Sequence, residues 1–156
     1  MRDDPTRSTA HGFWRFSANY LLAARAVDVK IRSEGNLFYP ALLYGLSIEL
    51  GLKAFLLKRG HSLTKMRRIS HKLTDALALA RRHKLGRVVK VTRKEVLAVR
   101  ALDITYASDQ LRYIVTGSTK VPHLIDIARL AERLVVGLEY LCTGMQGRID
   151  HDRPGT

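Results

Sequence analysis

Two arginines and a histidine, Arg67, Arg68 and His71, fall within one five-residue stretch of the chain. The stretch runs into a predicted helix for which Ser70 is the expected N-cap. Free backbone N–H groups and the dipole at a helix start favour an anion, so this corner is a candidate phosphate site. His71 is also a candidate general base, because imidazole titrates near neutral pH. The alternative is structural, with His71 capping the helix or packing at its start.

A second candidate cluster lies in the apolar run from Pro40 to Gly60. Glu49 and Lys53 are four residues apart with the acid first, so on a helix they lie one turn apart and can pair. An isolated charge among apolar neighbours is costly, whereas a paired one is tolerated. Two interpretations follow. The pair is an internal contact that fixes helix packing, or it lines a ligand cleft shared with Tyr44 and Ser47, in which Lys53 contacts phosphate.

The charge of the chain is concentrated in one segment. The 156 residues carry a net charge of +13 at pH 7, and residues 58–94 hold thirteen Lys and Arg against one acid, Asp75. Such a density attracts polyanions by counterion release, whether RNA, DNA, nucleotides or an acidic protein. The alternative is a solvated face that keeps the protein soluble. Besides Arg67 and Arg68, the basic-patch candidates are Lys58, Arg59, Lys65, Lys72, Arg81, Arg82 and Lys84.

Other chemistries find little support in the sequence. The six histidines form neither an HExxH motif nor an i, i+4 pair, so we expect no metal site and no cofactor. A glycine-rich phosphate loop, a nucleophile elbow and a CxxC motif are also absent. The single cysteine, Cys142, lies on an apolar stripe and is expected to be a buried small hydrophobe. With one cysteine and no apolar signal segment, a cytoplasmic setting is expected.

The most apolar predicted helix runs from Ala41 to Leu57 and is apolar on nearly every side, as expected in the middle of a bundle. Pro40 fits its first turn and Gly60 the left-handed position after its end. The run is too short and too interrupted for a bilayer-spanning helix. An amphipathic helix over 13–32 precedes it, with an apolar stripe of Phe13, Phe16, Tyr20, Ala24, Val27 and Ile31. Phe13, Trp14 and Phe16 are expected in the core rather than as base-stacking platforms.

Three more helices are predicted after residues 61–70, which are polar enough to form an exposed loop. The first ends at Gly86 and carries Leu73, Leu77 and Ala80 on one stripe. Residues 87–91 form a short connector, and Thr92 with Glu95 is a capping box that opens the next helix. The apolar stripe of that helix contains Leu97, Ala101, Ile104 and Leu111. The last helix starts near Pro122, ends at Gly144, and has a stripe of Leu124, Ala128, Ala131, Val135, Leu138 and Cys142.

Five helices with short connections and no strand pattern predict an all-α antiparallel bundle. The length fits a single domain, which we place at residues 13–144. Residues 1–12 are expected to be a flexible N-terminal arm and residues 145–156 a flexible C-terminal tail.

The pattern resembles the HEPN family, the helical domains named for higher eukaryotes and prokaryotes nucleotide-binding. The resemblance rests on LLYGLSIELGLKAFLLKRGHS, a short basic loop, SHKLTDALALA and ITYASDQLRYIV, and it covers Phe13 to about Cys142. It implies a bundle of four or five helices that often dimerises, with RNA, nucleotides or a cognate nucleotidyltransferase-like protein as partners. It also makes Arg112 and Tyr113 candidate ligand contacts. The alternative for Arg112 is a cation that complements a helix C-terminus.

Many members of that family are ribonucleases of toxin–antitoxin or defence systems. They carry an arginine, four to six intervening residues and a histidine, brought together across a dimer. That motif is not intact here, since three residues separate Arg67 from His71 and also Arg7 from His11, and ten separate Arg112 from His123.

The sequence therefore favours a non-catalytic, homodimeric HEPN-like module that binds RNA or nucleotide phosphate through its basic face. A first alternative is a metal-independent ribonuclease that uses the shortened pair of Arg67 or Arg68 with His71. A second is a dimeric interaction module whose basic face docks an acidic partner, such as a cognate antitoxin. None of the three requires a membrane.

Overall fold

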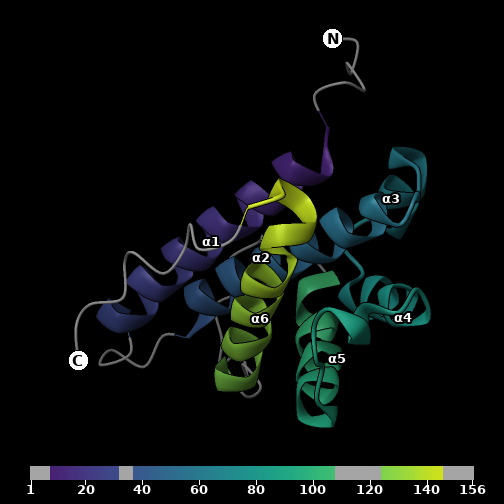
Figure 1. The fold of residues 1–156 in the computed structure, drawn as a ribbon. Coiled ribbons are helices and arrows are strands. Elements are labelled where there is room, and N and C mark those ends of the chain that lie inside the picture. The colour runs from purple at the N-terminus through teal and green to yellow at the C-terminus, as the bar shows by residue number, and fades with distance from the viewer. Residues whose placement is uncertain (1–7, 32–36, 108–123, 146–156) are drawn as a thin grey trace, which may run out of the picture.

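A computed structural model of the chain describes residues 8–31, 37–107 and 124–145 (Figure 1). Within these ranges the protein is helical and contains no strand. The predicted all-α bundle is confirmed, and a short additional helix, α3, joins the five that were expected. The elements are α1 (Ala10–Ile31), α2 (Phe38–Lys58), α3 (Leu63–Ile69), α4 (Leu73–Arg82), the 3-10 turn η3 (Leu85–Arg87), α5 (Arg93–Ala107) and α6 (Leu124–Thr143).

Helix α2 is the centre of the bundle, with α1, α6, α4 and α5 all packed against it. Thirteen of its 21 residues are buried, which explains why it is apolar on nearly every side. Gly60 has φ +88° after the helix end. The Gly60 N–H donates to the Leu57 carbonyl at 3.0 Å, and the His61 N–H donates to the Leu56 carbonyl at 3.1 Å. These two bonds form a Schellman motif, as the placement of Gly60 predicted.

The prediction that the central apolar helix, α2, is too short and too interrupted to span a bilayer was wrong. Its 21 residues are long and apolar enough to cross a membrane by length and composition, because the helix starts at Phe38, two residues before Pro40. About two thirds of its most apolar window is buried in the bundle. Packing against other helices therefore accounts for most of this apolar surface.

Helices α1 and α2 approach each other closely at a pair of serines. Ser17 Oγ donates to the Ser47 carbonyl at 2.6 Å, and Ser47 Oγ donates to the Ser17 carbonyl at 2.9 Å. A Cβ added at Gly51 would lie 3.1 Å from Ser17 Oγ and 3.4 Å from Leu134 Cβ, so glycine lets α1 and α6 come near α2 at this level. Trp14 is buried and its indole N–H donates to the Val135 carbonyl at 2.8 Å, which links α1 to α6.

The predicted apolar face of α1 was right at Ala24 but wrong as a whole. The buried residues of this helix are Trp14, Ser17, Leu21, Ala24 and Asp28. Phe16, expected in the core, is 61% exposed, whereas Trp14 is buried as predicted and Phe13 packs at the edge of the core. The polar residues Ser17 and Asp28 face inward because they have partners on α2, and this hid the true face from a hydropathy pattern. Helix α1 also begins at Ala10, inside the predicted arm of residues 1–12.

Residues 61–70 do not form the predicted exposed loop. Ser62 Oγ accepts the Lys65 N–H at 3.1 Å and caps α3, and Met66 is buried beneath this helix. Ser70 therefore ends α3, with φ +54°, and does not open α4. Helix α4 ends at Arg82, well before the predicted stop at Gly86.

The predicted capping box at the start of α5 is confirmed. The Thr92 N–H donates to Glu95 Oε2 at 2.8 Å, and the Glu95 N–H donates to Thr92 Oγ1 at 3.3 Å. The predicted apolar stripe of α5 was wrong, since Leu97 and Ile104 are exposed. Leu111 lies outside the described residues. Among residues 93–104 of this helix, the buried ones are Glu95, Ala98, Val99 and Leu102. The stripe of α6 was predicted correctly, except that Ala128 is only half-buried.

Candidate anion-binding site

A buried carboxylate joins two of the predicted site residues. Glu49 and Lys53 lie one turn apart on α2, and Lys53 Nζ donates to Glu49 Oε1 at 2.6 Å. His71, between α3 and α4, places Nδ1 3.0 Å from Oε1 and 3.1 Å from Oε2 of the same carboxylate. Glu49 and Lys53 are both buried, whereas the His71 side chain is 41% exposed. The cluster thus extends from the interior of the bundle to the surface, where the imidazole of His71 is partly exposed.

The carboxylate orients the imidazole of His71. An ionised carboxylate only accepts hydrogen bonds, so the contact with Glu49 places a proton on Nδ1. In the neutral ring Nε2 then carries the lone pair. A half-exposed imidazole in this orientation can accept a proton from a group outside, and in its charged form it can contact an anion.

Tyr44 and Ser47 do not share this cluster, although the sequence suggested a common cleft. Ser47 bonds Ser17 on α1, and the Tyr44 hydroxyl donates to Asp28 Oδ2, also on α1, at 3.4 Å. Both hydroxyls turn toward α1, whereas Glu49 meets His71 at the connection between α3 and α4.

The predicted phosphate corner at the start of α4 is occupied by a side chain of the protein itself. Asp103 of α5 accepts the Leu73 N–H at 2.9 Å and the Thr74 N–H at 3.1 Å. A carboxylate therefore already fills the anion position of this helix N-terminus. Asp103 lies 30 residues after Leu73, and no local sequence signal links it to that helix start.

Arg67 and Arg68 remain candidates for anion binding because both are exposed on α3. They belong to what we call the basic segment, residues 58–94. All thirteen of its Lys and Arg residues are exposed. They are Lys58, Arg59, Lys65, Arg67, Arg68, Lys72, Arg81, Arg82, Lys84, Arg87, Lys90, Arg93 and Lys94.

The basic segment spans neighbouring elements. It runs from the end of α2 through α3 and α4 to the first turn of α5. In Figure 1 α3, α4 and α5 lie on the right of the molecule, and α1 extends to the left. The segment can therefore present its charge over several adjacent helices.

A pair of histidines next to α3 was not anticipated. The rings of His61 and His83 pack edge to face, with their centroids 4.4 Å apart. Nε2 of His61 is buried and has no hydrogen-bond partner among the described residues. Burial lowers the pKa of His61, and the charges of His83 and Lys65 lower it further. His61 is therefore neutral at pH 7 and adds no charge to the basic segment.

The remaining predictions concern residues away from this cluster. Arg112 and Tyr113 lie outside the described residues. In the part of the chain that the structure describes, no group of three potential metal ligands occurs. Cys142 is buried as predicted. Burial raises the pKa of its thiol to about 11, against a smaller opposite effect of Lys58, so the thiol is protonated at neutral pH.

Comparison with known proteins adds no relative to this description. No protein-family model, curated protein or solved structure matches the chain.

Proposed function

We propose that this protein is a HEPN-like helical module that binds RNA or nucleotide phosphate through its basic segment without cutting it. The observation that carries the proposal is the exposure of all thirteen Lys and Arg side chains of that segment, with Asp75 as its one acid. Neutralising the phosphates of a nucleic acid with such side chains releases condensed counterions, which drives binding.

Twelve of the thirteen charges of the basic segment, all except that of Arg67, are also available to an external anion. Apart from Arg67, none of the thirteen forms an ion pair with a carboxylate among the residues that the structure describes. Two arginines outside the segment pair with carboxylates among the described residues: Arg25 of α1 with Glu132, and Arg133 of α6 with Glu95. A fold that used this charge only internally would place carboxylates beside it.

Removing four arginines together tests the proposal. The variant carries Ala at Arg67, Arg68, Arg81 and Arg82, and binding to an end-labelled single-stranded RNA is titrated with salt. We expect weaker binding and a logarithmic salt slope that is smaller by up to about 2.8, since each phosphate contact contributes roughly 0.7 for single strands. The RNA should stay intact on a denaturing gel.

The control removes three exposed cations elsewhere, with Ala at Arg15, Lys30 and Arg129 of α1 and α6. These changes should leave the slope almost unaltered. An unchanged affinity and slope in the quadruple variant would exclude the basic segment from RNA binding. No binding of the wild-type protein at low salt would instead favour the docking of an acidic protein partner.

The contact between Glu49 and His71 favours one second candidate, a metal-independent ribonuclease. Glu49 fixes the imidazole with Nε2 as the acceptor, and this nitrogen would take the proton of a ribose 2′-hydroxyl as its oxygen attacks the adjacent phosphorus. The P–O5′ bond then breaks, the leaving 5′-oxygen takes a proton from the imidazolium or from water, and a 2′,3′-cyclic phosphate remains. Arg67 or Arg68 would stabilise the charge that develops on that phosphate. A protein with this activity would cleave RNA in the presence of EDTA.

His71→Ala tests the second candidate. General-base catalysis contributes about 10²–10⁴-fold, so this variant should lose at least about 100-fold in cleavage rate. Circular dichroism checks that the helices persist. A wild-type protein that leaves RNA intact in EDTA, or a His71→Ala variant that cleaves at the wild-type rate, would rule the candidate out.

A further inference from the structure

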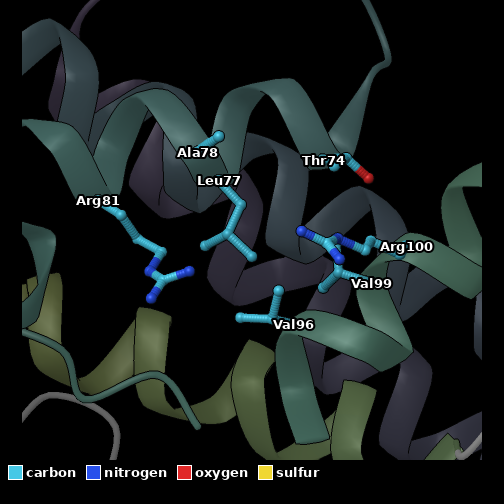
Figure 2. Close-up of a pocket in the computed structure, with 7 residues that line it drawn as sticks. All are labelled: Thr74, Leu77, Ala78, Arg81, Val96, Val99 and Arg100. Carbon is cyan, nitrogen blue, oxygen red and sulfur yellow. The ribbon is translucent and has the colours of Figure 1, made fainter. Parts of the chain in front are cut away.

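A shallow groove between α4 and α5 combines an apolar floor with two arginines. The groove contains about 270 Å³ of empty space and is open to solvent. It is lined by Thr74, Leu77, Ala78 and Arg81 of α4 and by Val96, Val99 and Arg100 of α5. Figure 2 shows Leu77 and Val96 lying between the guanidinium groups of Arg81 and Arg100. The groove therefore offers an apolar surface with a cation at either side.

The groove carries only positive charge. Arg81 and Arg100 are exposed, and the lining contains no carboxylate. Two acids of α5 lie near the groove in sequence. Glu95 is buried and bound by the Thr92 N–H and Arg133, and Asp103 is engaged by the Leu73 and Thr74 N–H groups of α4. Leu77 and Val99 are buried, so the floor belongs to the core and is fixed in place. A ligand that complements this surface has an apolar planar body and negative charge on either side of it.

We propose that the groove binds one base of a single-stranded RNA, with the phosphates on its two sides contacting Arg81 and Arg100. The inference rests on the proposed RNA binding and adds to it the site at which one base is bound. An unstacked base presents flat apolar faces between charged phosphates, and proteins bind such bases on apolar or aromatic surfaces and on guanidinium planes. Bases inside a duplex are stacked on one another, so the groove selects single strands.

Ala78→Leu fills the groove without changing its charge. Ala78 is half-buried on α4, and leucine is a good helix former, so the helix is preserved. Two probes are compared: an oligouridylate of about 12 nucleotides, a length within the range that single-strand-binding folds cover, and inorganic polyphosphate of equal charge. We expect the variant to bind the oligouridylate about tenfold more weakly, the loss of one base contact, with an unchanged salt slope. Polyphosphate has no bases, so its affinity should not change.

Two controls complete the test. Ala23→Leu makes the same change on the exposed side of α1 and should leave both affinities as they are. In the wild-type protein, which needs no substitution, the oligouridylate should bind about tenfold more tightly than an abasic strand of the same length.

Equal effects of Ala78→Leu on oligouridylate and polyphosphate, or no effect on either, would overturn the base-binding groove. So would equal wild-type affinity for the oligouridylate and the abasic strand. In those cases the quadruple arginine variant still decides whether the basic segment binds RNA. A wild-type protein that binds neither probe at low salt would remove both proposals together.

Discussion

Replacing Glu49 with leucine is expected to lower the free energy of unfolding by about 3–5 kcal/mol, the cost of breaking a buried ion pair by removing one partner. Glu49 is 4% exposed and receives the ammonium group of Lys53 at 2.6 Å. Lys53 is itself only 9% exposed, so its charge would remain in the interior without its carboxylate. Urea unfolding followed by the fluorescence of Trp14, the single tryptophan of the chain, measures the loss.

The double variant Glu49→Leu/Lys53→Met separates the charge effect from packing. The double variant leaves neither charge of the pair in the interior. Replacing a buried ion pair with apolar residues of similar volume often costs a protein little stability. We therefore expect the double variant to be more stable than Glu49→Leu alone. If the double variant were as unstable as the single one, loss of side-chain volume or of the His71 contact would be the cause, and not the stranded charge.

The elements predicted well from the sequence are those whose determinants are local. Gly60 ends α2 and Thr92 pairs with Glu95 because turn and cap chemistry acts within a few residues. The stripe of α6 was found because its buried positions, apart from Glu139, are apolar. The pairing of Glu49 with Lys53 followed from helix geometry alone, since the two residues share one helix.

The predictions that failed depend on residues far apart in the chain. Ser17 and Asp28 face the interior of the bundle because α2 supplies their partners, Ser47 and Tyr44. Without knowledge of that neighbour, a hydropathy pattern assigns them to the surface and rotates the predicted face of α1. Helix α3 was not predicted, because its sequence shows no apolar stripe. Met66 is its one buried residue, which is too little to show a periodicity.

The candidate site was likewise predicted only in part. Its residues could be named from charge and spacing, but its geometry could not. His71 meets Glu49 across 22 residues of chain, and Asp103 fills the start of α4 from 30 residues away. The exposure of the basic segment was foreseeable because lysine and arginine are rarely buried without a partner. Which helix start remains open to an anion depends instead on the packing of α5 against α4.

Replacing Arg133 with methionine is expected to lower the free energy of unfolding by about 2–3 kcal/mol. Glu95 is 1% exposed and holds two groups: Oε2 accepts the Thr92 N–H, and Oε1 accepts Nη2 of Arg133 from α6. Arg133 Nη1 also donates to the Lys90 carbonyl at 2.9 Å, so this side chain links α6 to the connector before α5. The cost falls below that of a fully buried pair because the Arg133 side chain is 37% exposed and solvent screens its charge.

Glu95→Gln should cost less, about 1 kcal/mol, because the two partners are not equivalent. Glutamine still accepts the Thr92 N–H as the third residue of a capping box, and the charge of a partly exposed Arg133 can be solvated. Arg133→Met instead leaves the carboxylate of Glu95 buried with a single backbone N–H as its remaining described partner. Urea unfolding of both variants gives the order of the two costs. A larger loss in Glu95→Gln than in Arg133→Met would mean that the cap, and not the interhelical ion pair, is the main contribution of Glu95.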